Sequence, residues 1–267
     1  MSSSAASRLN GKTILITGAS SGIGRAAAHE FAQTAPEHNL KLILTARRTS
    51  NLDEVSNSIK SSFPQVSVHT AQLDMTSSSA ITSFLPSLPK EYQEIDILVN
   101  NAGTVRGVAP AGEVPEDHIS SMIDTNVSGL IHMTQAVLPG MKSRNRGDII
   151  NIGSIAGREG YPGGSIYCAS KAAVRAFTEA MRKELISTKV RVMEIDPGQV
   201  ETEFSIVRFS GDEKKAKEVY KGVDPLTPED IAETIVWVAS RRENVVVADM
   251  LVFPNHQAAA QVLHRRQ

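Results

Sequence analysis

Seven short apolar segments alternate with helical patterns along the chain, and this alternation limits the fold more than any other feature. The apolar segments are continuous, as in strands that are buried on both faces of a sheet. We expect strands at KTILITGA, KLILTAR, VSVHTAQLD, DILVNNAG, DIINIGS, VRVMEIDPG and DMLVFP. Strands and helices in strict alternation predict a Rossmann-like α/β fold, a doubly wound parallel sheet of seven strands with helices on both faces.

The segments between these strands have helical periodicity. We expect helices at residues 23–35, 52–62, 77–88, 116–143, 165–187 and 228–241. Thr227 before Pro228 is a typical helix start. No repeat or linker divides the chain, so we expect one domain over residues 1–267, with residues 1–10 flexible.

Residues 199–226 form the longest stretch without an expected strand or long helix. This stretch follows the end of a strand, which is where ligands bind in open α/β sheets. Long loops in compact domains are often lids. We therefore predict a substrate lid, with a short helix at residues 216–220.

Composition excludes several classes of function. The 267 residues have a formal net charge of −1, which gives no field that attracts nucleic acid or an anionic membrane. Cys168 is the single cysteine, and we interpret it as a packing residue; the histidines show no metal-ligand spacing. The first residues lack the apolar core of a secretory signal, and no apolar run has the length of a membrane span. We expect a soluble, cytoplasmic protein without metal.

Glycines lie between the first expected strand and the helix that follows it. Gly18, Gly22 and Gly24 have the spacing T-G-x-x-x-G-x-G in ILITGASSGIGRAAA. Glycines at this point allow a tight turn and let backbone N–H groups approach a pyrophosphate at the helix start. The flanking strand and helix are the context that a dinucleotide site requires.

Two arginines follow the second expected strand, at the position that selects between coenzymes. An NAD site has Asp or Glu here to bind the ribose 2′-hydroxyl, whereas Arg47 and Arg48 suit a 2′-phosphate. We therefore expect NADP, with either arginine sufficient and with Ser20 and Ser21 as additional ligands. The alternative is a solvated basic pair, but positive charge at a helix start opposes the helix dipole.

Two later strand ends offer further cofactor contacts. Asp74 follows the third expected strand and could accept from the adenine amino group, or it could cap a helix. The run Asn100 to Gly103 ends the fourth strand. In this run we expect Asn101, Ala102 and Gly103 to bring backbone close to the cofactor ribose, with the asparagine amides fixing neighbouring loops.

Tyr167 and Lys171 lie four residues apart in SIYCASKAA, at the start of an expected helix. This spacing places a phenol and an ammonium group on one helical face. A neighbouring ammonium group lowers a phenol's pKa, so we expect Tyr167 to exchange a proton with an alcohol or carbonyl. Ser154 follows the fifth expected strand, and Asn126 lies in the long helix before that strand.

The glycine turn, NNAG, Asn126, Ser154 and Tyr167-x-x-x-Lys171, in this order, resemble the short-chain dehydrogenase/reductase family. The resemblance covers essentially the whole chain. It implies that Tyr167 is the general acid and base, that Lys171 holds the nicotinamide ribose, and that Ser154 binds the substrate oxygen. It also implies that Asn126 distorts its helix and anchors a water for a proton relay to Lys171.

The family resemblance implies further contacts and an assembly. It places Pro197 and Gly198 under the nicotinamide and adds Ile23, Val200 and Thr202 to the cofactor-binding residues. It also implies a homotetramer, in which the helix from Glu116 and the Tyr167 helix pack against another subunit. The tail after Pro254 would then cross to a neighbour.

Three segments are similar to the NADP-dependent 3-hydroxy acid dehydrogenases of bacteria and yeasts: DTNVSGLIHMTQAVLPGM, GDIINIGSIAGREGYPGGSIYCASKAAVRAF and PGQVETEFSIVRFSGD. This similarity implies oxidation of serine, allo-threonine and related 3-hydroxy acids. Such substrates need a group that binds a carboxylate, and Arg208 is our first candidate, with Arg158 second. We expect Tyr161 and Pro162 to narrow the pocket.

Asp196, before Pro197, departs from the neutral residue of many relatives, and we expect no effect on the chemistry. Two other functions stay open. The chain could be a broad NADPH-dependent carbonyl reductase of ketones and aldehydes. It could also be a non-catalytic NADP-binding protein, since fold alone does not fix function.

Overall fold

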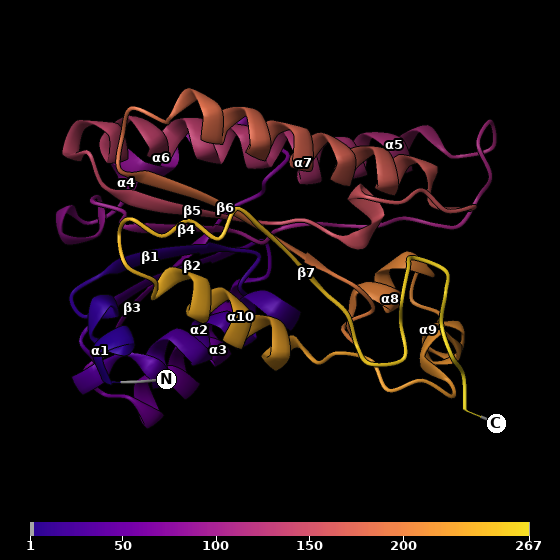
Figure 1. The fold of residues 1–267 in the computed structure, drawn as a ribbon, viewed down its shortest axis with the longest axis horizontal. Helices are drawn as coiled ribbons and strands as arrows, with labels where there is room; N and C mark the ends of the chain where they lie inside the picture. The colour runs from indigo at the N-terminus through magenta and orange to yellow at the C-terminus, as the bar shows by residue number, and fades with distance from the viewer. Residues whose placement is uncertain (1–2, 267) are drawn as a thin grey trace.

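A seven-stranded parallel sheet runs through the centre of the protein (Figure 1). The computed structural model describes residues 3–266. The strand order is β3-β2-β1-β4-β5-β6-β7, and every pair of neighbours is parallel. The strands are β1 (Thr13–Thr17), β2 (Lys41–Ala46), β3 (Ser67–Gln72), β4 (Ile97–Asn100), β5 (Gly147–Ile152), β6 (Val190–Pro197) and β7 (Asp249–Val252). The predicted seven-stranded, doubly wound sheet is confirmed.

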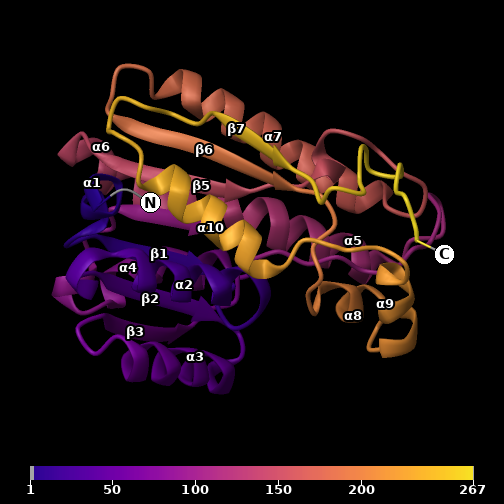
Figure 2. The same cartoon turned by 60° about the horizontal axis from the view of Figure 1, so that its bottom comes forward.

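Helices cover both faces of this sheet (Figure 2). One face packs against α2 (Gly22–Thr34), α3 (Thr49–Ser62) and α10 (Pro228–Ala239). The other packs against α4 (Ser78–Ser87), α6 (Leu130–Arg144) and α7 (Ser165–Glu184). Short helical turns lie at η2 (Pro36–His38), η3 (Lys90–Tyr92) and η5 (Ile155–Gly157).

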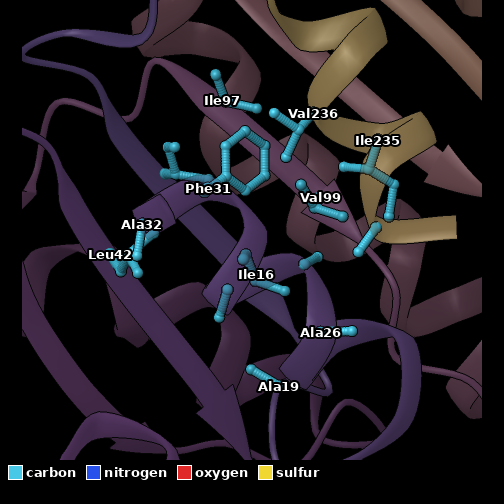
Figure 3. Close-up of a cluster of buried hydrophobic side chains, with 14 of the residues drawn as sticks. Ile16, Ala19, Ala26, Phe31, Ala32, Leu42, Ile97, Val99, Ile235 and Val236 are labelled. Carbon is cyan, nitrogen blue, oxygen red and sulfur yellow. The ribbon is translucent and has the colours of Figure 1, made fainter. Parts of the chain in front are cut away.

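The core on the α2 and α10 face explains why the strand segments are continuously apolar (Figure 3). Ile16 of β1 and Val99 of β4 are fully buried beside Phe31 of α2 and Val236 of α10. Leu15, the neighbour of Ile16, is fully buried on the opposite face. Both side-chain directions of a central strand therefore enter a core, which removes the alternation of polar and apolar residues.

The expected helix at 116–143 is divided into three parts. It consists of α5 (Glu116–Ile123), the π-helical segment η4 (Asp124–Gly129) and α6. Both α5 and α6 keep an apolar face, so their residue pattern does not reveal the interruption. A π-turn adds a residue to the turn, and such turns are frequent at functional sites.

The predicted lid at 199–226 contains two helices. The helix α9 (Glu213–Tyr220) includes the expected helix at 216–220, whereas α8 (Phe204–Arg208) was not predicted. The two helices are joined because Ser205 Oγ lies 2.6 Å from the Tyr220 hydroxyl, which donates to Val200 O at 3.0 Å. Residues 101–115 form a second long loop that the sequence analysis did not single out.

The described termini pack against the domain. We expected residues 1–10 to be flexible, and residues 1–2 lie outside the described part of the chain. The next residues form α1 (Ser3–Ala6) and η1 (Ser7–Leu9), with Leu9 fully buried and Arg8 donating to Ser240 O at 2.8 Å. At the other end, the Arg266 N–H donates to Gly222 O at 2.6 Å, so the tail lies on the lid of its own chain.

Within residues 3–266, no helix has both the length and the apolar character needed to cross a membrane.

The start of α10 tests the local account of helix formation. Asp230 N donates to Thr227 Oγ1 at 3.3 Å, and Thr227 N donates to Asp230 Oδ2 at 2.7 Å, which forms a capping box. We expect Thr227→Ala to lower the free energy of unfolding by about 1 kcal/mol. Thr234→Ala, which removes the same chemical group within the helix, is the control in denaturant titration. Equal losses in the two variants would contradict a specific role for the cap.

Candidate active site

The turns after β1 and β4 are joined by a set of hydrogen bonds. Thr17 Oγ1 accepts from the backbone N–H groups of Asn101 and Ala102, at 3.1 and 3.0 Å. The Asn101 amide donates in return to Thr17 O at 2.9 Å and to Gly18 O at 3.2 Å. The strand order reverses between β1 and β4, which is where ligands bind in open α/β sheets.

Two glycines permit this close approach. Gly18 has φ +69°, and a Cβ on it would lie 2.8 Å from Ala102 Cα. A Cβ on Gly24 would lie 2.5 Å from the Asn101 amide nitrogen. Any larger residue at either position would separate the turn after β1 from the NNAG segment, so the glycine spacing has a structural cause here.

Arg48 lies against the glycine-rich turn. Its Nη2 donates to Ser21 Oγ at 2.9 Å and to Ser20 Oγ at 3.5 Å, and it forms an ion pair with Glu203 at 3.0 Å. Arg47 is exposed, and its backbone oxygen accepts from Gln72 Nε2 at 3.1 Å. Of the two candidate arginines, Arg48 is therefore the one that contacts the glycine-rich turn. The Glu203 carboxylate is paired with its guanidinium.

Asp74 shapes a turn at the end of β3. Its Oδ1 accepts from Thr76 N at 3.0 Å and from Thr76 Oγ1 at 2.9 Å. The cap of α4 is the next residue, Ser77, whose Oγ accepts from Ala80 N at 3.2 Å. Ser77 and not Asp74 therefore caps this helix, Asp74 closes the turn before it, and its contact with the adenine amino group stays a prediction.

The start of the lid lies beside the glycine-rich turn. A Cβ on Gly22 would be 3.5 Å from Thr202 Cγ2. Pro197 ends β6, and the Gly198 N–H donates to Val252 O at 2.7 Å. Val200 forms a bridge with Leu226 at the far end of the lid. Ile23, in the first turn of α2, is half-buried against the core.

Lys171 is almost fully buried inside the protein. Its Nζ donates to Ile152 O at 2.7 Å, at the carboxyl end of β5. A Cβ on Gly103 would lie 3.8 Å from this nitrogen, so the NNAG turn and Lys171 meet. Burial lowers the pKa of Lys171 to about 8, against the opposing effects of the Glu194 and Asp196 carboxylates.

Tyr167 is buried beside Lys171 on α7, and burial has the largest effect on its pKa. Burial raises the pKa of Tyr167, whereas a hydrogen bond with Ser154 and the charge of Arg208 act in the opposite direction. In the protein without coenzyme, burial thus outweighs the groups that lower this pKa, and its lowering by Lys171 together with the positive nicotinamide of the oxidised coenzyme stays a prediction. Helical spacing places two side chains on one face, but it does not show how deeply that face is buried.

Ser154 joins the end of β5 to the Tyr167 helix. Its Oγ accepts from Ala156 N at 3.1 Å and caps η5, and the same side chain acts on the Tyr167 phenol and lowers its pKa. Its backbone N–H donates to Asp196 Oδ1 at 3.0 Å. The residue thus has a capping role and also contacts the phenol.

Asn126 lies inside η4 and connects it to two other elements. Its Oδ1 accepts from Thr104 N at 2.7 Å, and its Nδ2 donates to Thr104 O at 2.9 Å and to Ser170 Oγ at 3.0 Å. The helix is distorted where Asn126 lies. Both amide hydrogens are used within the protein, so this side chain fixes the loop after β4 against α7 and has no N–H left for a water.

Arg208, at the end of α8, faces the same region. Its guanidinium lies 5.6 Å from the Tyr161 ring centroid, and its buried Nε has no hydrogen-bond partner among residues 3–266. The ring of Phe204, also in α8, lies 5.6 Å from the Tyr167 ring. The helix α8 therefore brings a cation and an apolar ring to the neighbourhood of the phenol.

Arg158, our second candidate for binding a carboxylate, is engaged elsewhere. Its Nε donates to Asp196 Oδ2 at 2.7 Å, and its Nη2 pairs with Asp249. Tyr161 is half-buried, whereas Pro162 is exposed. Arg208 is thus the arginine whose guanidinium is less committed to acids of the chain.

Several residues with structural roles at the site were missed by the sequence analysis. Thr17 and Thr104 fix the turns after β1 and β4, and Ser170 fixes Asn126. Thr17 is the first residue of the T-G-x-x-x-G-x-G pattern, so the motif contained a signal for it. Glu203 reaches Arg48 over 155 residues of sequence, and no local pattern indicates that pairing.

Comparisons with known proteins agree with this arrangement. The family model described as short chain dehydrogenase matches residues 12–212. An NADP-dependent 3-hydroxy acid dehydrogenase of Schizosaccharomyces pombe is 54% identical over 98% of this chain and 99% of its own length. A serine 3-dehydrogenase of Rhizobium radiobacter is 40% identical over 93% of this chain and 96% of its own length.

A solved structure of the closed form of serine dehydrogenase complexed with NADP⁺ has a TM-score of 0.86 and 43% identity. It covers 95% of this chain and 99% of its own. The fold, the motifs and the extent of these matches lead to one conclusion. The chain belongs to the short-chain dehydrogenase family.

Proposed function

We propose that the protein is an NADP-dependent oxidoreductase that interconverts small 3-hydroxy acids and their 3-oxo forms. The proposed substrates are of the serine, allo-threonine and 3-hydroxypropionate type. The observation that carries the proposal is the convergence of Ser154, Tyr167 and the under-bonded Arg208 at the carboxyl end of the sheet. The similar 3-hydroxy acid and serine dehydrogenases support it.

The residues at the glycine-rich turn fit a coenzyme with a 2′-phosphate. The Arg48 guanidinium contacts the hydroxyls of Ser20 and Ser21. The Glu203 carboxylate pairs with the same guanidinium, where the 2′-phosphate of the coenzyme would bind. Strand β2 is followed by arginines rather than by the acid that an NAD site uses. When bound, NADP supplies or accepts the hydride at its nicotinamide.

The chain's own residues supply the proton and the positioning. Ser154 holds the substrate oxygen next to the Tyr167 hydroxyl, which donates its proton to a carbonyl or removes the proton of an alcohol. Because burial raises the pKa of Tyr167, its phenol is protonated at neutral pH. The protonated phenol is the general acid that reduction of a carbonyl needs. Lys171, fixed by Ile152 O, adds a cation on the coenzyme side when it is protonated.

Arg208 accounts for the acidic part of the substrate. Arginine binds carboxylates through two parallel N–H groups, and the buried Nε of Arg208 lacks a partner among the described residues. Its charge already acts on Tyr167, so a carboxylate bound to it would lie near the reacting carbon.

A second candidate function is reduction of apolar ketones and aldehydes. It is favoured by a separate apolar cluster around Tyr167, which includes Val105 and Met122, with Phe204 of the lid packed against it. Such a surface suits a substrate without charge. The two functions differ in whether the substrate's carboxylate contributes to catalysis.

We also infer a homotetramer in which α5, η4, α6 and α7 form the interface between two of the subunits. On the apolar face of these helices, Leu130 and Val137 are buried within the protomer, but Ile123, Val127 and Ile131 are only partly buried. A second copy would cover these remaining apolar side chains.

Removal of the Tyr167 hydroxyl tests the chemistry. Tyr167→Phe keeps the ring contact with Phe204 but removes the proton, so we expect turnover to fall by about 10²- to 10⁴-fold with NADP binding retained. Tyr161→Phe is the matched control and should change turnover far less. Steady-state kinetics and coenzyme titration measure both, and normal turnover in Tyr167→Phe would remove the assignment.

Removal of the Arg48 guanidinium tests coenzyme selection. A hydrogen bond to a charged group is worth about 1.5–3 kcal/mol, so Arg48→Ala should weaken NADP binding by about 10- to 150-fold. NAD binding should change little, and Arg47→Ala should have the smaller effect on NADP. In contrast, Glu203→Gln removes a competing anion and should strengthen NADP binding. Equal weakening of NAD and NADP in Arg48→Ala would contradict 2′-phosphate recognition.

Removal of the Arg208 guanidinium tests the substrate class. We expect Arg208→Ala to lower kcat/KM for L-serine by about 10- to 150-fold, the range for a lost charged hydrogen bond. The loss for a neutral alcohol should be much smaller, and Arg208→Lys should restore part of the L-serine activity. Equal losses on both substrates would refute carboxylate binding and favour the carbonyl reductase.

A further inference from the structure

Two buried carboxyl groups lie behind Ser154, and the proposed chemistry uses neither. Glu194 and Asp196 are neighbours on the same face of β6, with exposed fractions of only 2% and 1%. Burial of an ionised carboxylate is costly unless charged or hydrogen-bonding partners compensate. The partners of the two groups therefore decide which of them is ionised.

Asp196 has the partners of an anion. Its Oδ1 accepts from the Ser154 backbone N–H at 3.0 Å, and its Oδ2 accepts from Arg158 Nε at 2.7 Å. Arg158 also pairs with Asp249 at the edge of the sheet. Our expectation that Asp196 has no effect on the chemistry therefore overlooked a direct contact with Ser154.

Glu194 lacks such partners. Its buried Oε1 has no hydrogen-bond donor among residues 3–266. A Cβ on Gly153 would overlap both Glu194 Oε1 and Asp196 Oδ1, so the two oxygens face the same small space. Two charged oxygens in that space would repel each other, whereas one proton between them would form a hydrogen bond.

No donor reaches Glu194 Oε1 among residues 3–266, and the charges of Lys171 and Arg158 lower the pKa of Glu194 less than burial and Asp196 raise it. Lys171, Arg175 and Arg182 face the pair from α7, and Asp249 faces it from β7. The Lys171 ammonium group and the Arg182 guanidinium donate to backbone oxygens. Arg158 is shared between Asp196 and Asp249.

We infer that Glu194 and Asp196 share one proton and form a positioning pair for Ser154. In this arrangement neutral Glu194 donates to ionised Asp196, and Asp196 holds the Ser154 backbone and Arg158. The inference deepens the proposed function and rests on it, because Ser154 is the residue that would hold the substrate oxygen. Glu194 and Asp196 act through Ser154 and do not touch the substrate.

Loss of the shared proton has a defined consequence. Burial, and then the neighbouring Asp196, raise the pKa of Glu194 to about 8. The folded protein thus keeps a proton that an unfolded chain releases near pH 4.3. The associated stability is fully present below about pH 4 and is lost as pH rises through about 8. Above that value the two anions repel, and the Ser154 segment loses its fixed position.

The variant Glu194→Gln tests the pair, because an amide donates to Asp196 as the acid does but cannot ionise. We expect kcat at neutral pH to fall by about threefold or less. The decline of wild-type kcat above about pH 8 should be smaller in this variant. Glu179→Gln, in the exposed part of the neighbouring groove, is the control and should keep the wild-type profile. Lys171 titrates in the same range and is retained in this variant, so a decline in Glu194→Gln as large as that of the wild type would assign the decline to Lys171 and overturn the inference.

Two measurements do not depend on turnover. The wild-type infrared spectrum should contain a protonated-carboxyl band at neutral pH that disappears above about pH 8 and is absent from Glu194→Gln. The loss of stability from about pH 4 to 8 should likewise be smaller in that variant. If no hydroxy acid is oxidised but both signals behave as described, the proposed function fails and the proton-sharing pair remains. If turnover is found without either signal, the pair is refuted.

Discussion

The hydrogen bonds between the turns after β1 and β4 are the interaction on which the site depends. Thr17 and Asn101 exchange backbone and side-chain bonds across the point where the strand order reverses. Gly18 and Gly24 allow the turns to approach to the distance that these bonds need. These hydrogen bonds place the start of α2 at the same edge of the sheet as the ends of β4 and β5. Arg48 and its serine partners therefore lie at this edge too.

The second half of the site is organised by elements that fix one another from several directions. Asn126 joins the loop after β4 to α7, while Ile152 O holds Lys171 at the end of β5. Asp196 holds the Ser154 backbone from β6. Lys171 and Ser154 are thus positioned by strands β5 and β6, and α8 contributes Arg208.

The sequence predicted the features that have a local pattern. The seven strands were recognisable because each is a continuous apolar run, and the glycine turn because its spacing is tied to a strand and a helix. The π-helical segment around Asn126 was not visible as such, since α5 and α6 keep an apolar face on either side of it. Asn126, inside this π-helical segment, is held by Thr104 and Ser170, which are distant in sequence.

The electrostatics of the site were the least predictable part. The spacing of Tyr167 and Lys171 correctly placed both on α7, but the pKa of Tyr167 is raised by burial, which spacing cannot indicate. The ion pair of Arg48 with Glu203 joins residues from opposite halves of the chain. Such pairings depend on the whole fold, and they decide which charges are free to bind a ligand.

The central claim is that one edge of the sheet holds both a phosphorylated coenzyme and the Tyr167 hydroxyl. A crystal structure of the protein with bound NADP tests it most directly. The account predicts the 2′-phosphate on Arg48, with Glu203 displaced, and the reactive nicotinamide carbon beside Tyr167 and Ser154. A nicotinamide ring bound away from the Tyr167 hydroxyl, with Arg48 still paired to Glu203, would contradict it.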